Sequence, residues 1–490
     1  MTNYNIPSEF YFRLHHVRPR FKGDIENVLI FMAEEVVKIG KLKVEDFSEN
    51  MRIAIRNYPG NSMIELKTIN NWRTEISALF GFVLHRDDYD EPGQRAMELE
   101  HNQDLVEFFK LFLFSFQYPG AHIKSQAVLE QINAGIHFKP AQYILKLLRY
   151  ANSVEKSSVG ITKFEVCHCI YNDLRCTRDK EEVSNVWNRI KVNRELSVQY
   201  DQTGDVIRYA GDIIDYMEIA NLLKTYDSRT YYLNTLEESS IIKFTESCEW
   251  FNAYDQMINN RSGNIVRINE VRDQWFEYVN RDLGKTDFST DILAFIANDA
   301  EDLKKLKENV ELISVNREIL SNDFQKREEI IGERIRTEKN EFRTKDIGDM
   351  GESIIHSHEC MRVKMNGRED LLHLIKRIPT QFALGYDIVS VELDERKRFI
   401  EVKTTISSKP LHFNRIHMTK NEWNTANSTR DRYFVYRLLI SKEERRLFLL
   451  QDPVGLYKSD QINMIPSDGA EINFNPNNVG YFEDLLTWRT

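Results

Sequence analysis

The sequence predicts a multidomain chain with a mainly helical N-terminal part, a long connector helix and a C-terminal α/β domain. Its 490 residues are enough for about two to four domains. Residues 301–331 contain no Gly or Pro, and residues 301–345 carry as many basic as acidic side chains, which predicts a charged helix. Short apolar strands follow it. The predicted domains are therefore 1–150, 151–295, 296–345 and 346–490.

The composition is that of a folded, soluble protein of the cytoplasm. Hydrophobic residues make up 41% and aromatic residues 11% of the chain, and no apolar run is long enough to cross a bilayer. The beginning of the sequence lacks the features of a signal peptide, and its five Cys fit reduced thiols. The net charge of −10 does not exclude a nucleic-acid partner, because such a partner needs only local basic surface.

The N-terminal domain, 1–150, should be helical. Gln103–Phe116 is heavily apolar and predicts a packed helix, and Arg13–Lys22 is a basic segment with aromatic neighbours. Lys67–Phe82 predicts either a helix-turn-helix element or an amphipathic core helix, because its apolar residues recur at helical spacing, at Ile69, Trp72, Ile76 and Leu79.

The next domain, 151–295, has the order of elements of a winged-helix fold. Helix Thr162–Asn172 precedes a second helix, Glu181–Leu196. Ser197–Tyr200 and Val206–Tyr209 then flank a turn-rich stretch, which predicts the hairpin that would form the wing.

The second of these helices carries Asn and Arg side chains, which suit reading base edges in the major groove because they can form paired hydrogen bonds with a base. A basic residue in the predicted wing would contact phosphate. The alternative is a solvated helix face beside an ordinary hairpin, and we favour DNA contact. The predicted DNA-binding residues are Asn185, Asn188, Arg189, Lys191, Arg194 and, in the wing, Arg208.

Three charged residues of the C-terminal domain favour metal-dependent chemistry. An apolar strand carries Asp387, and the turn Asp394–Lys397 leads to a strand with Glu401 and Lys403. Side chains alternate faces along a strand, so Glu401 and Lys403 project together, and the hairpin register could bring Asp387 beside Glu401. Two such carboxylates suit Mg²⁺, which takes its remaining ligands from water and phosphate.

A Glu-x-Lys pair on a strand is by itself usually a solvated surface with a weak ion pair. The surrounding elements favour the metal site instead. A helix opens at Gly348–Glu352, and a short extended piece, Leu411–Phe413, follows the two strands. Thr419 should cap a helix, with Glu422 completing a capping box. The last strands of this α/β core are Tyr433–Leu439 and Arg446–Leu450.

Residues 346–460 resemble the PD-(D/E)xK nuclease superfamily, and more narrowly its branch at the C-terminus of the plant NO VEIN protein and in restriction systems. The resemblance implies that Asp387 and Glu401 bind Mg²⁺, that Lys403 is the catalytic lysine, and that Glu352 is an accessory acid. Tyr386 replaces the Pro of the superfamily's name. The matching pieces are Gly351-Glu352 with Glu359, Gly385–Ser390, Ile400–Lys403, and Asn421–Trp423 with Ala426 before Tyr433.

The N-terminal segments are also similar in arrangement to recognition regions of restriction enzymes that separate binding from cutting. The sequence therefore predicts a Mg²⁺-dependent, sequence-specific restriction endonuclease that acts on double-stranded DNA. Because one such site cuts one strand, we expect a homodimer at least during cleavage. Two alternatives remain, a non-catalytic winged-helix DNA-binding regulator and a repair or RNA-directed nuclease with the same metal site.

Overall fold

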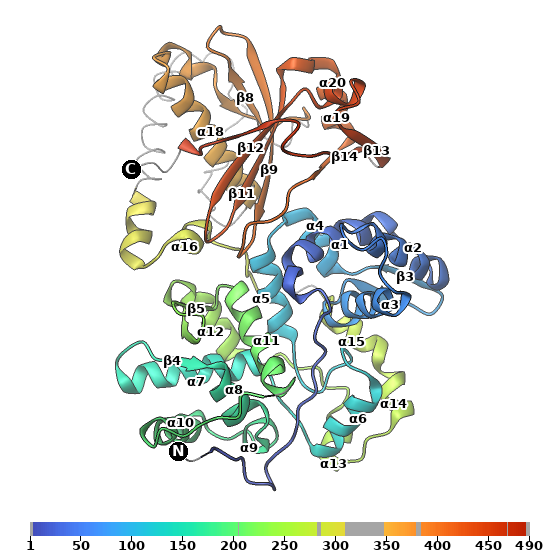
Figure 1. The fold of residues 1–490 in the computed structure, drawn as a ribbon, viewed down its shortest axis with the longest axis vertical. Helices are drawn as coiled ribbons and strands as arrows, with labels where there is room; N and C mark the ends of the chain where they lie inside the picture. The colour runs from blue at the N-terminus through green and yellow to red at the C-terminus, as the bar shows by residue number, and fades with distance from the viewer. Residues whose placement is uncertain are drawn as a thin grey trace, which may run out of the picture. The chain divides into compact units, whose positions relative to one another are not determined.

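The chain divides into two units that differ in secondary structure, Met1–Phe288 and Ser289–Thr490 (Figure 1). The computed structural model describes residues 3–203, 205–281, 286–308, 347–378, 384–467 and 469–486. The predicted boundary between 150 and 151 falls inside helix α7 (Pro140–Glu155), so both predicted N-terminal domains belong to the first unit. Most of the predicted connector helix falls on 309–346, outside the described residues.

A helix, a lone strand, further helices and a β-hairpin follow one another twice in the first unit. In both copies the lone strand pairs with the second strand of the hairpin, which gives the sheet orders β1-β3-β2 and β4-β6-β5. The first copy consists of α1 (Ile25–Ile39), β1 (Leu42–Lys43), α2 (Val44–Asn57), α3 (Leu66–Thr74), the π-helical turn η2 (Glu75–Leu79), β2 (Val83–His85) and β3 (Tyr89–Pro92).

The second copy begins with α7 and has more helices between its lone strand and its hairpin. Its elements are β4 (Gly160–Thr162), α8 (Lys163–Val166), η3 (Cys167–Tyr171), α9 (Leu174–Thr177), α10 (Val183–Glu195), α11 (Asp205–Ile219), β5 (Leu223–Thr225) and β6 (Thr230–Leu233). The predicted helices at 162–172 and 181–196 are thus present, the first as α8 and η3 and the second as α10.

The predicted wing hairpin is wrong. Residues 206–209 lie in α11, and Arg208 is therefore on a helix. The turn residues were identified correctly, since Asp201 Oδ1 accepts a hydrogen bond from Thr203 N at 2.9 Å. The chain after this turn has helical periodicity, however, and α11 buries Ile213, Ile214 and Met217 along one face. The hairpin of this copy is β5–β6.

Helix α5 (Leu105–Ser115), the predicted packed helix, joins the two copies. It is buried along nearly its whole length, and its Phe109 stacks on Tyr216 of α11 with ring centroids 5.4 Å apart. Phe80, which follows η2 in the first copy, lies 6.3 Å from the same Tyr216 ring. Even the Lys110 ammonium of α5 is buried, and it is paired with Glu237 at 2.8 Å. The two copies therefore share one aromatic core.

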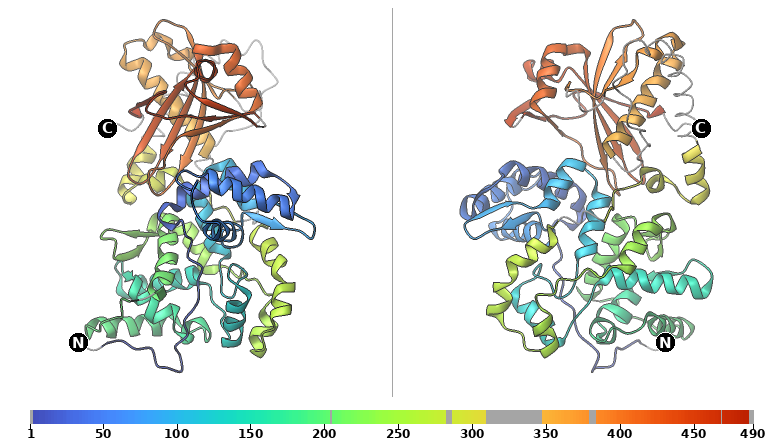
Figure 2. Two further views of the ribbon diagram at one scale, coloured as in Figure 1. Left: turned by 45° about the vertical axis from the view of Figure 1, so that its right-hand side comes forward. Right: turned by 180° about the vertical axis from the view of Figure 1, so that it is seen from behind.

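The remaining helices of the first unit pack beside these copies. A second apolar cluster draws on α6, α13, α14 and α15, which lie together in Figures 1 and 2. No helix of the described part of the chain is long and apolar enough to span a bilayer. The bounds are α4 (Gln94–Asn102), α6 (Ser125–Ala134), α12 (Glu238–Glu246), α13 (Asp255–Asn260), α14 (Ile265–Glu270) and α15 (Arg272–Val279).

The second unit is built on a six-stranded sheet of order β15-β12-β11-β9-β8-β7. Strands β9 and β11 run parallel, and the other neighbours run antiparallel. A smaller sheet has the order β10-β14-β13. The bounds are β7 (Lys376–Arg377), β8 (Ile388–Val391), β9 (Lys397–Ile406), β10 (Arg415–Met418), β11 (Tyr433–Ile440), β12 (Arg445–Gln451), β13 (Asn463–Ser467), β14 (Gly469–Asn473) and β15 (Tyr481–Glu483).

Helices cover both faces of the large sheet (Figures 1 and 2). Helix α18 (Ile347–Met365) lies so close to β9 that a Cβ on Gly351 would come within 1.9 Å of Thr404 Oγ1. Helices α19 (Lys420–Thr429) and α20 (Pro453–Lys458) pack on the opposite face through an apolar cluster that includes Ala426, Val435 and Val454. Because side chains alternate along β9, they point in turn toward the α18 layer and toward the layer of α19 and α20.

The predicted extended piece Leu411–Phe413 is not a strand of the large sheet. Its two apolar side chains are buried as alternation predicts, but its backbone joins no ladder. The third strand before α19 is instead the short β7, which precedes Asp387, and strand structure resumes at β10 in the smaller sheet.

Candidate functional site

Strand β9 places Glu401 and Lys403 on the face of the sheet that α19 covers, as their spacing predicts. Glu401 is only 5% exposed. The Lys403 Nζ donates to Glu401 Oε1 at 2.8 Å, and the lysine side chain retains 25% of its accessible surface. The site is therefore a buried carboxylate with a lysine that still reaches solvent.

Asp387 stands directly before β8 and is fixed to β9 by its backbone and its side chain. Its N–H donates to Ile400 O at 2.9 Å, and its Oδ2 accepts from Val402 N at 2.8 Å. Because Ile388 pairs with Ile400, Asp387 comes beside Glu401. The register expected from the hairpin is thus present, and the strands bring the two carboxylates together.

The loop before Asp387 is held by a glycine. Gly385 has φ +74, and a Cβ there would come within 2.6 Å of Thr425 Oγ1 and 2.8 Å of Asn421 O, both on α19. Its carbonyl accepts a hydrogen bond from Tyr433 OH at 2.8 Å. A side chain at Gly385 would push this loop away from the helix and move Asp387 with it.

Helix α19 brings a third carboxylate to the site, that of Glu422. Thr419 and Glu422 form the predicted capping box. The Glu422 Oε1 also accepts from Lys403 Nζ at 3.1 Å. The sequence predicts the capping box because its two residues are close along the chain. The contact between Glu422 and Lys403 joins residues that are distant along the chain, so no local sequence pattern predicts it.

Three carboxylates and one lysine give the site an excess of negative charge. Burial raises the pKa of Glu401 well above its ordinary value, and the Asp387 and Glu422 carboxylates add to the shift. Burial also raises the pKa of Asp387. Burial opposes the charge of Lys403, but Glu401 and Glu422 outweigh it and raise the lysine pKa. A bound cation would relieve this repulsion.

Glu352, the predicted accessory acid, lies on α18 and is held by an arginine. Arg377 of β7 donates to its Oε2 from Nη2 at 2.6 Å and from Nε at 3.1 Å. Burial raises the Glu352 pKa to about 7, with a further contribution from Asp387 and against the effect of Arg377. Glu352 is thus within electrostatic reach of Asp387 but is already paired.

Glu359, the other acidic residue of α18 in the matching pattern, is fully buried on the face that this helix covers. Its carboxylate accepts hydrogen bonds from Ser390 Oγ at 2.6 Å, Arg362 Nη2 at 2.7 Å and Tyr436 OH at 2.9 Å. Burial would raise its pKa, but Arg362 and Arg398 outweigh burial and lower it to about 2. This cluster holds α18 on the sheet.

We expect Glu359→Gln to destabilise the second unit by about 3–5 kcal/mol at neutral pH, because it breaks a buried ion pair and leaves the partly buried Arg362 without its counter-charge. A carboxylate with a lowered folded-state pKa stabilises above its unfolded pKa, about 4.3, and this contribution is lost as the pH falls toward the folded value. The difference from wild type should therefore shrink in acid. Denaturant unfolding at several pH values measures this difference in the free energy of unfolding. The control is Glu443→Gln, which changes an exposed side chain. An unchanged free energy of unfolding at neutral pH would contradict this role.

The residues predicted to bind DNA lie on two helices of the first unit. Asn185 and Asn188 are exposed on α10, and Arg208 is exposed on α11. The other three cations are on α10, and carboxylates of the same unit hold them. The pairs are Arg189 with Glu181 at 2.6 Å, Lys191 with Glu155 at 2.9 Å, and Arg194 with Glu165 at 2.6 Å.

The β5–β6 turn is an exposed feature that the sequence interpretation missed. Tyr226 at its tip is 82% exposed, and Arg229 is exposed beside it. Asp227 Oδ1 shapes the turn by accepting from the N–H groups of Arg229 at 2.9 Å and Thr230 at 2.8 Å. The Asp-Ser-Arg sequence between alternating apolar residues was the available signal.

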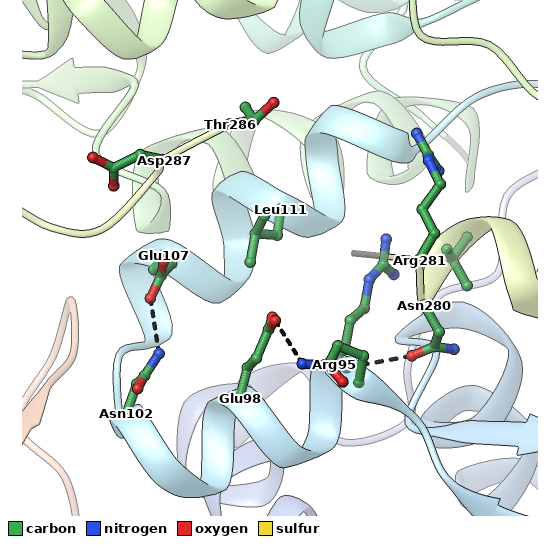
Figure 3. A pocket seen from close by; sticks show the side chains of 11 residues that line it. Arg95, Glu98, Asn102, Glu107, Leu111, Asn280, Arg281, Thr286 and Asp287 are labelled. Atoms are coloured by element: carbon green, nitrogen blue, oxygen red, sulfur yellow. Dashed lines mark hydrogen bonds between the residues drawn. The ribbon is translucent and has the colours of Figure 1, made fainter. Parts of the chain in front are cut away.

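A cavity of about 270 Å³ lies in the first unit (Figure 3). Its polar lining groups are engaged with one another and with the backbone. Glu98 accepts from Gln94 at 3.0 Å, Glu107 accepts from Asn102 at 3.3 Å, and buried Arg95 donates to Phe80 O at 3.3 Å. The carboxylate and lysine cluster of the second unit is therefore the stronger candidate for chemistry.

Two family models match the chain. Residues 4–276 match the family described as restriction endonuclease BpuJI, N-terminal, and residues 351–450 match protein NO VEIN, C-terminal. The second range contains every carboxylate and the lysine of the candidate site, and the match confirms the predicted resemblance to the C-terminus of the NO VEIN protein. No curated protein matches the chain.

A solved structure is similar to the first unit in fold. It is the crystal structure of pyrene- and phenanthrene-modified DNA in complex with the BpuJ1 endonuclease binding domain. The TM-score is 0.50 and the identity is 23%, over 57% of this chain and 100% of that chain. The similarity at this identity concerns the fold alone.

Proposed function

Because the chain belongs to the family of restriction endonuclease BpuJI, N-terminal, we propose that it is a Mg²⁺-dependent DNA endonuclease of a restriction system. The first unit recognises double-stranded DNA and the second unit cuts it. The observation that carries this proposal is the convergence of Asp387, Glu401 and Lys403 at one end of a sheet, inside the range matched to the NO VEIN C-terminal family.

The order of elements in the second unit supports a PD-(D/E)xK core. Helix α18, strands β7, β8 and β9, helix α19 and strand β11 follow one another, and β9 and β11 are parallel neighbours. Asp387 precedes the second of these strands and Glu401-x-Lys403 lies on the third. The sequence predicted the Asp387 strand, the Glu401-x-Lys403 strand and the α19 helix in this relative order, but it placed the third strand at Leu411–Phe413 and missed β7.

The donor atoms at the site fit Mg²⁺. No three His, Cys, Asp or Glu side chains among the described residues are arranged to hold a metal ion by themselves. Mg²⁺ commonly uses only one or two carboxylates and completes its coordination with water and phosphate oxygens, so Asp387 and Glu401 suffice. Mg²⁺ bound there would polarise the scissile phosphate and lower the pKa of an attacking water.

The chain's own residues then position the reactants. Asp387 and Glu401 would hold the metal through their carboxylate oxygens, and the Lys403 ammonium would stabilise negative charge that develops on the phosphate. The lysine is already charged, because two carboxylates raise its pKa against the effect of burial. Glu352 is the proposed accessory acid, and its ion pair keeps the Arg377 guanidinium beside the site. The Glu352 carboxylate thereby adjusts the net charge of the site.

Recognition of DNA by the first unit rests on its two helix–strand–helix–hairpin copies, whose order is typical of winged-helix domains. Exposed Asn185 and Asn188 on α10 can reach base edges, and Arg208 can reach phosphate. Exposed Arg229 in the turn of the β5–β6 hairpin adds a second contact. Arg189, Lys191 and Arg194 are proposed as further DNA contacts of α10, and DNA would then compete with their carboxylate partners.

Cleavage of both strands requires two such sites, so we propose that two copies of the chain associate at least during cutting. The cytoplasm is the proposed location. Incubation of the full-length protein with duplex DNA and with RNA, in Mg²⁺ or in EDTA, tests the function. We expect duplex DNA to be bound in both conditions and cut only in Mg²⁺. Binding without cutting would favour the regulator, and preferential cutting of RNA would favour an RNA-directed nuclease.

A further inference from the structure

Glu422 uses its two carboxylate oxygens for two different tasks. Its Oε2 accepts from the N–H of Thr419 at 3.1 Å, which closes the capping box of α19. Its Oε1 accepts from Lys403 Nζ at 3.1 Å. One carboxylate thus ties the lysine to the N-terminus of a helix.

A helix cap alone does not require this arrangement. The cap uses only one oxygen, and acidic residues at such positions are ordinarily solvated. The Glu422 side chain is only 11% exposed, and its carboxylate is paired with the Lys403 ammonium at 3.1 Å. The buried position is therefore explained by the lysine and not by the cap.

We propose that Glu422 is a positioning residue that holds the Lys403 ammonium in place for the reaction. The inference rests on the proposed function. A lysine side chain is long and flexible, and its other anchor is Glu401, which the proposed function commits to the metal. Glu422 supplies a second anchor from a different element, because its backbone is fixed in α19. It acts through Lys403 and does not touch the substrate.

Glu422→Gln tests the inference in the full-length protein, with Thr419→Ala as the matched control. The Gln variant keeps the volume but loses the charge that holds the lysine. We expect its single-turnover cleavage rate at saturating DNA and Mg²⁺ to fall by roughly 10- to 100-fold, as for an ångström-scale misplacement of a catalytic group. The DNA affinity and the Mg²⁺ concentration for half-maximal rate should not change.

Thr419→Ala removes the hydroxyl of the same cap and leaves Glu422 beside Lys403. It should lower the stability of the second unit by about 1 kcal/mol and cut at the wild-type rate. A wild-type maximal rate in Glu422→Gln would overturn the inference. So would an equal loss of rate in Thr419→Ala, which would assign the effect to the cap, or a rate restored by excess Mg²⁺, which would make Glu422 a metal ligand.

These outcomes are separate from those that test the function itself. If the wild type fails to cut DNA in Mg²⁺, the proposed function and this inference both fall. If the wild type cuts and Glu422→Gln cuts equally well, only this inference falls.

Discussion

Replacing Lys403 with alanine should abolish DNA cleavage and leave DNA binding nearly unchanged. The ammonium is the only cationic side chain among the four proposed catalytic residues, and loss of a group that stabilises developing charge costs about 10²–10³-fold in rate or more. DNA contacts are assigned to the first unit, which does not contain Lys403. Nicking and linearisation of a supercoiled plasmid in Mg²⁺ measure cleavage, and a gel shift in EDTA measures binding.

The control for this experiment is Lys397→Ala, which removes a lysine from the same strand. Lys397 is exposed at the beginning of β9, six residues before Lys403, and should be dispensable. Unchanged binding by Lys403→Ala also reports that the first unit is folded, and a separate unfolding curve reports on the second. Normal cutting by Lys403→Ala in Mg²⁺ would show that the site is assigned wrongly.

Asp387→Asn should remove both cleavage and the stabilisation that Mg²⁺ gives to the folded protein. A ligand that binds only the folded state stabilises it, by about 2.7 kcal/mol at a hundred times its dissociation constant. We therefore expect Mg²⁺ to raise the thermal midpoint of the second unit in the wild type and not in the variant. The fold should persist, because an amide oxygen can replace Asp387 Oδ2 as the acceptor for Val402 N.

The control is Asp394→Asn in the exposed hairpin turn, which removes the same charge a few residues away. Its midpoint should rise with Mg²⁺ as in the wild type. An equal rise in Asp387→Asn would exclude this aspartate as a metal ligand.

The sequence predicts those features of the second unit that depend on residues close together along the chain. Alternation fixed the faces of Glu401 and Lys403, the hairpin register brought Asp387 beside Glu401, and the Thr419–Glu422 capping box is present. Sequence reasoning failed where distant segments meet. The contact of Glu422 with Lys403 depends on how α19 lies across the sheet.

The third strand of that sheet was missed for a related reason. The sequence predicted an extended piece at Leu411–Phe413. Leu411 and Phe413 are buried, but their segment pairs with no strand of the sheet. The strand that does pair, β7, is only two residues long, Lys376–Arg377, and is too polar and short to show a period.

In the first unit, turn chemistry was recognised but the element after it was not. The Asp201 turn leads into helix α11 and not into a hairpin. The repeated order of elements has no counterpart in a sequence repeat, because the two copies share topology and not residues. The pairing of Arg189 and Arg194 with Glu181 and Glu165 likewise depends on tertiary packing.

Mapping the ends of DNA cut by the full-length protein tests the central claim, that a separate unit directs the cutting unit. A defined plasmid, methylated and unmethylated, is incubated in Mg²⁺ or in EDTA, and the ends are sequenced. We predict ends only in Mg²⁺, each at a fixed distance from one shared short sequence. Ends scattered without a common sequence, or ends that form equally in EDTA, would contradict the account.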